Sequence, residues 1–214
     1  MILPRVMPVL LLRGRGLVKT SRFKDPVYLG DPVNVIRIFN DKEVDELTLL
    51  DIDATRQNRG PNLPLLREIA SECFMPLGYG GGITTVDQVK QLLALGIEKV
   101  VINSRAADDP AFVTAAADQA GSQSVVVSID VKRRLFGGLR VMTRAGTHDT
   151  GADPVAYALA MQARGAGELI VNAIDRDGTM QGYDVELVRR VASAVDIPVV
   201  ACGGASGIQD LGRA

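Results

Sequence analysis

The sequence repeats itself at an offset of 122 residues. Residues 51–71 align with residues 173–193, and residues 73–82 align with residues 195–204. The alignment superimposes the following pairs: Asp53 on Asp175, Ala70 on Ala192, Pro76 on Pro198 and Gly81 on Gly203. Any two strand–helix units share a loose apolar pattern, but matched aspartate, proline and glycine positions indicate true duplication. Two copies of a four-strand half predict a closed eight-stranded barrel.

Short apolar runs alternate with amphipathic segments along the whole chain. The runs occupy residues 6–12, 46–53, 73–81, 99–104, 124–130, 168–175 and 198–204. Most of them are continuous and rich in β-branched residues, which is typical of strands buried on both faces of a parallel sheet. Strand–helix alternation of this kind demands parallel pairing with helical crossovers. The predicted fold is therefore an α/β (β/α)8 TIM barrel.

Helix boundaries can be read from capping residues. An aspartate followed by proline predicts a helix start at Asp31-Pro32, Asp109-Pro110 and Asp153-Pro154. Thr85 and Gln88 form the pattern of a capping box. Glycines at 96, 121 and 165 predict the ends of the helices that precede them.

The strand count predicts an incomplete barrel. Seven strands can be recognised, and residues 206–214 begin only the seventh helix, so the eighth βα unit is expected to be missing. We therefore expect a single barrel domain over residues 1–214, with half-repeats at approximately 1–122 and 123–214. Either the sequence is a fragment or another segment completes the barrel, because an open barrel would leave unpaired strand edges.

Composition narrows the functional classes. The chain is 47% hydrophobic with a net charge of −1, which suits one soluble domain and suggests neither a nucleic-acid nor a membrane partner. The apolar start lacks the features of a signal peptide and is interpreted as a strand. Cys73 and Cys202 are expected to be buried thiols of a cytoplasmic protein. His148 is the only histidine, which argues against a histidine-rich metal site and a Ser-His-Asp triad.

In such barrels, the reactive groups lie at the carboxyl ends of the strands. Asp130 ends the fifth run without a clear cap pattern, whereas Asp51, Asp53 and Asp175 have the alternative reading of helix caps. Glycine turns follow the third run (80–82) and the seventh run (203–204). Such turns allow backbone N–H groups to approach an anion, although a lone glycine turn is more often a tight connection. Their repetition favours a substrate with two phosphates.

Several phrases resemble the HisF family, the ammonia-using subunit of imidazole glycerol phosphate synthase. They are DPVNVIRIFNDKEVDELTLLDIDAT, GYGGGI, GSQSVVVSIDVKR, RGAGELIVNAIDRDGTMQGYD and PVVACGGASG. The resemblance implies a lyase-type cyclase subunit of histidine biosynthesis that converts PRFAR and ammonia into imidazole glycerol phosphate and AICAR. It implies a HisH-like glutaminase partner on the N-terminal face, with ammonia passing through the barrel. It implies no metal and no organic cofactor.

The resemblance also assigns residues. The family's acid–base pair lies at the ends of the first and fifth strands, in patterns resembling CLDVK and SID. Asp130 is the member on the fifth strand, but Leu11 occupies the position of the other aspartate. Lys19 lies in the long loop expected to close over the site, and Asp51 or Asp177 is a possible replacement base. Leucine cannot transfer a proton, so cyclase activity of the ordinary kind is in doubt.

The remaining assignments fall into two phosphate sites and a gate. Gly82, Asn103 and Ser104 match one phosphate site, and Asp177, Gly178, Gly203 and Gly204 match much of the other. Arg5, Glu46, Lys99 and Glu168 match the charged ring that gates the ammonia passage, with a salt-bridged surface cluster as the alternative. Glu98 stands where relatives often have an aspartate at the glutaminase contact.

Three functions remain open from the sequence. The first is the HisF cyclase itself. The second is a cyclase-deficient HisF-like paralogue that passes ammonia to a third protein, an amidotransferase that amidates a sugar of a surface polysaccharide such as O-antigen. Leu11 together with a retained gate slightly favours this second role. The third is a HisA-like isomerase, against which Leu11 counts equally because that reaction also needs two acid–base carboxylates.

Overall fold

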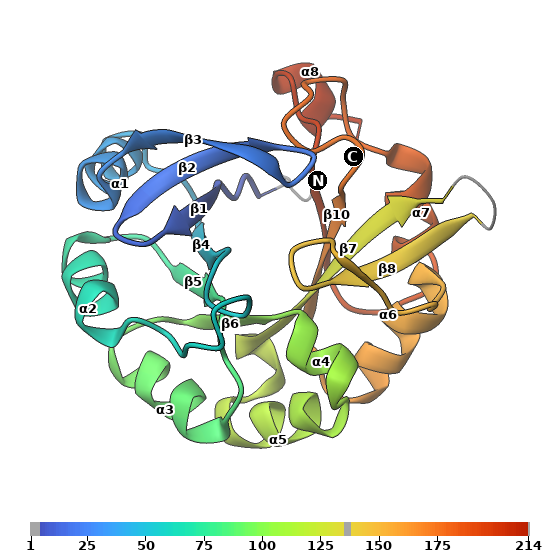
Figure 1. Ribbon diagram of the computed structural model, residues 1–214, viewed down its shortest axis with the longest axis horizontal. Helices are drawn as coiled ribbons and strands as arrows, with labels where there is room; N and C mark the ends of the chain where they lie inside the picture. Colours follow the sequence, from blue (N-terminus) through green and yellow to red (C-terminus); the bar gives the residue numbers. More distant parts are fainter. Residues whose placement is uncertain (1–4, 135–137, 214) are drawn as a thin grey trace. The chain divides into compact units, whose positions relative to one another are not determined.

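The computed structural model describes residues 5–134 and 138–213, and the chain divides into two compact units (Figure 1). The first unit comprises Met1–Lys19 and Pro26–Val101, and the second comprises Thr20–Asp25 and Ile102–Ala214. Each unit alternates parallel strands with helices, which is the βα repeat of a TIM barrel. The predicted α/β class is therefore confirmed.

The first unit is built on four parallel strands. In their spatial order they are β1 (Val9–Arg13), β4 (Leu47–Asp51), β5 (Leu77–Gly80) and β6 (Lys99–Ile102). They coincide with the first four predicted runs, although β5 is shorter than predicted and begins at Leu77. Three helices connect them: α1 (Pro32–Asp41), α2 (Leu63–Glu72) and α3 (Val86–Ala94).

The predicted helix starts of this unit are confirmed. The Asp31 side chain accepts hydrogen bonds from the backbone N–H groups of Val33 and Asn34, with Pro32 in the first turn. Thr85 and Gln88 form both halves of the capping box at the start of α3. Gly96, with a φ of +90°, follows the end of α3 as predicted.

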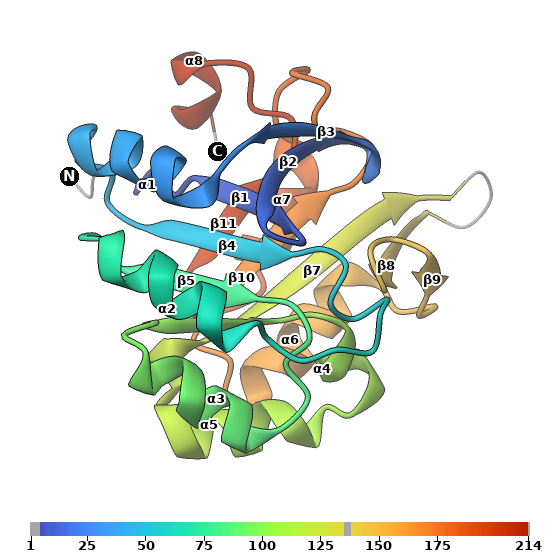
Figure 2. The same cartoon turned by 60° about the vertical axis from the view of Figure 1, so that its left-hand side comes forward.

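A β-hairpin that the sequence reading missed follows β1. The chain turns at Gly14, which has a φ of +63°, and β2 (Gly16–Ser21) runs back antiparallel along β1. A further strand, β3 (Lys24–Gly30), continues from the turn (Figure 2). The prediction that Lys19 lies in a loop is therefore wrong, because backbone pairing with β1 makes it part of β2. Apolar alternation across 16–21 was too short to reveal a strand.

In the described part of the second unit, three strands run parallel. β10 (Glu168–Ala173) lies between β7 (Val125–Arg133) and β11 (Val199–Cys202). β7 extends past the predicted end at residue 130, because its last residues pair antiparallel with β8 (Leu139–Thr143). β8 in turn pairs with the short strand β9 (His148–Asp149). The two latter strands were not predicted.

Helices cover the connections of the second unit. Its longer helices are α5 (Ala111–Ala120), α6 (Pro154–Ala163) and α7 (Val185–Ala192). Its short ones are α4 (Ser104–Asp108), η1 (Ser122–Ser124) and α8 (Ile208–Leu211). The start at Asp153-Pro154 is confirmed, and Gly121 and Gly165 follow the ends of α5 and α6.

The predicted start at Asp109-Pro110 needs correction. Asp109 is the C-cap residue of the unpredicted helix α4, and Pro110 is the N-cap residue of α5. The Asp109 carboxylate still accepts a hydrogen bond from the Ala111 N–H, as a capping group does. Cys73 is also only half-buried, at the end of α2, and Cys202 is half-buried at the end of β11, so the prediction of two buried cysteines is too strong.

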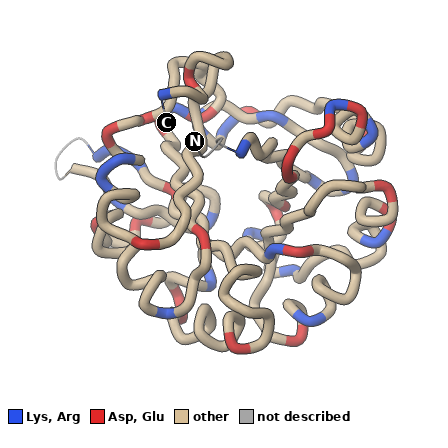
Figure 3. Tube along the Cα trace, turned by 180° about the vertical axis from the view of Figure 1, so that it is seen from behind, with Lys and Arg blue, Asp and Glu red and all other residues tan. Residues whose placement is uncertain are grey.

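Apolar side chains between strands and helices form the core of each unit. In the first unit they include Leu12, Ile36, Leu49, Leu66 and Leu92, and in the second Val113, Val127, Ile129, Leu169 and Val191. Basic and acidic residues are both scattered over the trace (Figure 3), in keeping with the small net charge. Among the helices that the structure describes, none has the length and apolar character needed to cross a membrane.

Candidate functional site

A row of polar side chains lies at the carboxyl ends of the strands of the second unit. The register places Asp130 of β7 opposite Asn172 of β10, and Asn172 opposite Cys202 of β11. Residues paired in this way on parallel strands point to the same face of the sheet. All three neighbouring strands therefore present a polar group at one level, in a sheet whose other positions are mostly apolar.

Asp130 is buried without a cationic partner among the described residues. Its carboxylate accepts hydrogen bonds from the Asn103 Nδ2 at 3.3 Å and from the Ser128 hydroxyl at 3.3 Å. Burial raises the pKa of Asp130 to about 7; the Ser128 hydrogen bond opposes this shift and the negative charge of Asp177 adds to it. A carboxyl group with such a pKa can both donate and accept a proton near neutral pH.

Asn172 is the residue of this row that sequence reasoning missed. It is buried, and its Oδ1 has no hydrogen-bond partner among the described residues. A buried amide oxygen without a partner is costly unless a ligand or water satisfies it. The signal in the sequence was a single asparagine inside the apolar run ELIVNAID. Asn172 therefore adds an acceptor for a ligand beside Asp130.

Asp177 and Gly178, predicted to bind phosphate, contact the turn between β2 and β3. The Asp177 carboxylate accepts hydrogen bonds from the Thr20 hydroxyl at 3.1 Å and from the Phe23 N–H at 3.4 Å. A Cβ on Gly178 would collide with the Thr20 carbonyl oxygen. Burial raises the pKa of Asp177, against these two hydrogen bonds. In this structure the turn at Thr20–Asp25 therefore covers these two residues.

The other predicted phosphate site is divided between the two units. Asn103 and Ser104 lie in the second unit, where the Ser104 hydroxyl accepts a hydrogen bond from the Arg144 N–H at 3.0 Å. The Asn103 Nδ2 also donates to the Ser128 carbonyl at 2.9 Å. Gly82 lies in the first unit, after β5. The two polar side chains are thus held by backbone contacts within their own unit.

The glycine pairs 81–82 and 203–204, one from each half-repeat, make similar close backbone contacts within their units. Gly81 and Gly203 both have positive φ, and a Cβ on either would lie within 2.8 Å of a carbonyl oxygen at the end of the neighbouring strand, β4 for Gly81 and β10 for Gly203. A Cβ on Gly82 or Gly204 would collide with a carbonyl oxygen of the preceding loop. Close backbone approach therefore requires glycine at all four positions, whether or not they also bind an anion.

The corresponding carboxylates of the first unit are neutralised by arginine. The Asp51 side chain is fully buried and accepts two hydrogen bonds from Arg59, at 2.8 and 2.9 Å. It also accepts hydrogen bonds from the N–H groups of Asp53 and Ala54. This hydrogen-bonded pair raises the pKa of Arg59. Asp51 is therefore a structural group that fixes the β4–α2 loop.

Asp53 and Asp175, matched by the repeat, also act structurally. The Asp53 carboxylate accepts a hydrogen bond from the Arg13 Nε at 3.1 Å, at the end of β1. The Asp175 carboxylate accepts one from the Arg133 N–H at 2.8 Å, at the end of β7. Each aspartate thus ties the loop of its unit to the end of a neighbouring strand.

Position 11 carries no proton-transfer group. Leu11 lies in β1, paired with Leu50 of β4 and with Val18 of β2. Lys19 is exposed on β2, and strand alternation turns it to the face opposite Val18. The first unit therefore has a leucine where the second has Asp130.

The predicted gate residues of the first unit, Arg5, Glu46 and Lys99, are joined by ion pairs. The Arg5 Nη1 lies 2.8 Å from the Glu46 Oε2, and the Lys99 Nζ lies 2.8 Å from the Glu46 Oε1. Glu46 is buried, just before β4, and Lys99 begins β6, so the cluster lies at the amino ends of the strands. Glu168 begins β10 in the second unit and is also buried.

Cys202 is a poor nucleophile. Although the residue as a whole is half-buried, desolvation of its thiol raises the pKa to about 12, and the negative charges of Asp177 and Asp130 add to the shift. Among the described residues, no group of three or more His, Cys, Asp or Glu side chains is arranged to hold a metal ion.

Comparison with known proteins gives consistent matches. The sequence pattern of the family described as "Histidine biosynthesis protein" matches residues 5–214. The chain is 53% identical over 211 residues to "Putative imidazole glycerol phosphate synthase subunit hisF2" of Pseudomonas aeruginosa, covering 99% of this chain and 84% of that protein. It is 47% identical to "Putative imidazole glycerol phosphate synthase subunit hisF3" of Vibrio vulnificus, covering 100% and 82%. It is 42% identical to "Imidazole glycerol phosphate synthase subunit HisF" of Alkaliphilus metalliredigens, covering 100% and 85%.

Proposed function

This chain belongs to the histidine biosynthesis protein family, and from that premise we propose that it is a HisF-type synthase subunit that receives ammonia from a HisH-like glutaminase. The family reaction joins ammonia to PRFAR and releases imidazole glycerol phosphate and AICAR. The observation that carries the proposal is Asp130, a buried carboxyl group with a pKa of about 7 and no cationic partner among the described residues.

Asp130 supplies one half of the acid–base chemistry of ring closure. With a pKa of about 7, the group is partly protonated at neutral pH and can both take and return a proton. Asn103 and Ser128 hold the carboxylate in place, and the unpartnered Asn172 Oδ1 offers an acceptor beside it. These residues support binding and orientation of a polar substrate in the second unit.

This chain offers no well-placed second acid–base group for ring closure. Leu11 cannot transfer a proton, and Asp51 is held in a two-pronged pair with Arg59. The negative charge of Asp177 helps to raise the pKa of Asp130. The Asp177 carboxylate, however, already accepts hydrogen bonds from the Thr20 hydroxyl and the Phe23 N–H. We therefore expect slow ring closure, with Asp177 as the residual second carboxylate once the Thr20–Asp25 turn moves away.

Delivery of ammonia to another acceptor is slightly favoured as the biological role. The pattern behind it is loss of the acid–base pair at Leu11 together with retention of the ion-pair cluster of Arg5, Glu46 and Lys99. In this role the chain is an ammonia channel and scaffold that serves a third protein, which amidates a sugar of a surface polysaccharide. A HisA-like isomerase fits less well, because it needs two acid–base carboxylates and no ammonia passage.

The amino ends of the strands in the first unit are suited to a partner protein. Phe74 is 84% exposed, and its N–H donates to the Asn40 Oδ1 at the end of α1, while Val6 is exposed just before β1. Exposed apolar side chains beside a charged cluster are typical of docking surfaces. We assign this edge to the glutaminase, with Arg5, Glu46 and Lys99 at the entry for ammonia.

The direct test is turnover of PRFAR with ammonium salts. We expect the purified protein to be slower than an ordinary HisF by about 100-fold or more, because one general acid–base group contributes about 10²–10⁴-fold. Turnover at the rate of an ordinary HisF would contradict the delivery role and support the cyclase role.

Glutaminase docking is tested separately by co-purification. A Phe74→Asp substitution should abolish capture of the glutaminase, whereas Met180→Asp, at another exposed apolar side chain, should not. Arg5→Ala should leave capture intact and change the transfer of ammonia from glutamine. Unchanged transfer in that variant would contradict the gate.

A further inference from the structure

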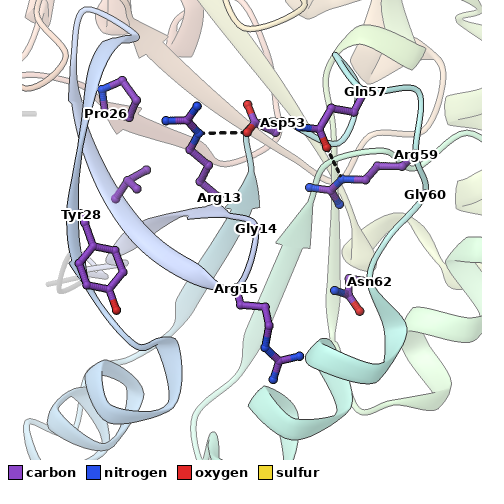
Figure 4. Close-up of a pocket in the computed structure, with 11 residues that line it drawn as sticks. Arg13, Gly14, Arg15, Pro26, Tyr28, Asp53, Gln57, Arg59, Gly60 and Asn62 are labelled. Carbon is purple, nitrogen blue, oxygen red and sulfur yellow. Dashed lines mark hydrogen bonds and ion pairs between the residues drawn. The ribbon is translucent and has the colours of Figure 1, made fainter.

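A cavity of about 800 Å3 lies in the first unit, between the β1–β2 hairpin and the loop after β4 (Figure 4). Its volume is within the range of about 300–1,000 Å3 that small-molecule sites occupy. Its polar lining includes Arg13 and Arg15 from the β1–β2 turn and Gln57, Arg59 and Asn62 from the loop that leads into α2. None of the residues predicted to bind phosphate lines it.

The cavity lies over the face of β1 that carries Leu11. Val18 lines the cavity and is the register partner of Leu11, and opposed residues of an antiparallel pair point to the same face. Arg13 follows two positions after Leu11 and shares this face by strand alternation. The strand that lacks a carboxylate at position 11 thus presents a cation at its end.

The guanidinium groups retain donors for a ligand. The Arg13 Nε donates to Asp53, and within residues 5–134 and 138–213 its two Nη groups have no partner. Arg15 uses one Nη on Glu68, in a pair that is more than half exposed. Arg59 is oriented by Asp51 and by the Gln57 Oε1, at 2.9 Å from its Nε. A planar guanidinium with free N–H groups suits a carboxylate or a phosphate.

The remaining side chains that line the cavity are suited to bind the hydroxyl groups and the ring of a ligand. The Asp53 carboxylate is a strong acceptor for hydroxyl donors, and Asn62 uses its Oδ1 to cap α2 while its Nδ2 remains available. Tyr28 of β3 adds an aromatic ring that is 68% exposed. An aromatic face provides a rigid apolar platform beside these polar groups.

We infer that this cavity binds an acidic sugar, a pyranose that bears a carboxylate or a phosphate. The acid group binds Arg13 and Arg15, the hydroxyls bind Asp53, Gln57 and Asn62, and the ring packs on Tyr28. The inference concerns the first unit alone and involves neither ammonia nor a glutaminase. Its failure would therefore leave the proposed function untouched.

The test is calorimetric titration of the purified chain with D-glucuronate, glucose 6-phosphate, glucose and inorganic phosphate. We expect a dissociation constant of about 1 mM or tighter for at least one acidic sugar, and binding weaker by at least about tenfold for glucose and for inorganic phosphate. Preference for glucuronate identifies the acid as a carboxylate, and preference for glucose 6-phosphate identifies it as a phosphate. Equal binding of glucose, or of inorganic phosphate, would overturn the inference.

Three variants locate the binding. Arg13→Gln should weaken it about tenfold, because a charge-assisted hydrogen bond contributes about that much. Asn62→Asp should weaken it similarly, since aspartate still caps α2 but adds a negative charge to the cavity. Arg37→Gln removes the same charge from an exposed pair on α1 and should change nothing. Affinity that is equal in the Arg13 and Asn62 variants and the unaltered chain would overturn the inference.

Discussion

The two units treat a buried carboxylate at a strand end in opposite ways. In the first unit, Asp51 is fully enclosed and bound by both arms of Arg59. In the second, Asp130 is also buried, but its side-chain partners among the described residues are Asn103 and Ser128, neither of which is charged. A paired carboxylate stabilises a loop, whereas an uncompensated one acquires a pKa near neutrality. The proton affinity of such an aspartate therefore depends on its partners as well as on its position in the strand.

The largest expected effect is loss of the cation in the first unit. Arg59→Ala leaves the buried Asp51 charge without its partner and should lower the free energy of unfolding by about 3 kcal/mol, the lower end for buried pairs because Arg59 is partly exposed. Urea denaturation of the variant and the unaltered chain measures this change in the free energy of unfolding. Arg37→Ala, which breaks an exposed pair, should stay within about 0.5 kcal/mol. Similar losses in both variants would mean that Asp51 is not specially dependent on its arginine.

The next effect restores a proton-transfer group to the first unit. Leu11→Asp should raise PRFAR turnover with ammonium by about 100-fold, at the low end of what a general acid–base group contributes. Leu11 is only partly buried, so the change should not prevent folding. An unchanged rate would mean that other contacts to the substrate are missing too.

A smaller effect concerns stability and pH in the second unit. The pKa of Asp130 is raised to about 7 in the folded state from an ordinary 3.8. The folded chain therefore holds this proton more tightly, and stability falls as the pH rises through the interval between these values. Asp130→Asn removes the penalty and should raise the free energy of unfolding at pH 8 by on the order of 2 kcal/mol. The gain should nearly vanish at pH 4, and a gain equal at both pH values would contradict the mechanism.

The smallest expected effect is at Cys202. With a pKa of about 12, its thiol is almost entirely protonated at pH 8 and should react slowly with iodoacetamide. Mass spectrometry of the intact chain and its peptides measures the modification at each cysteine. Rapid modification of Cys202 in the folded chain would show that its surroundings are less enclosed than those of Asp130.

Sequence patterns predicted the regular parts of the fold well. Helix capping by Asp31, Asp153 and Thr85 depends only on neighbours within four residues, and so it could be predicted from the sequence. The antiparallel pairs β1–β2 and β7–β8 were missed because their pairing depends on contacts with a strand of the existing sheet, not on long apolar runs. Tertiary pairing therefore added strands that local pattern could not specify.

For the candidate site, the sequence indicated which residues were candidates better than it indicated what each of them does. Asp130 was singled out as a carboxylate without a capping pattern, and the structure places it inside β7, three residues before the strand ends. The sequence gives no reason to pair Asp51 with Arg59, eight positions later across a loop, and so Asp51 stayed a possible base until its geometry was known. Asn172 was overlooked because one amide in an apolar strand carries little signal until its neighbours Asp130 and Cys202 are aligned with it.

The proton affinity of Asp130 is the most direct test of this contrast. Carbon-detected NMR of carboxyl-labelled protein, with Asp130→Asn as the assignment reference, follows the group through its titration. The structure predicts a midpoint at a pH of about 7. A midpoint near the ordinary aspartate value of about 4 would contradict it, because the second unit would then hold no better proton-transfer group than the first.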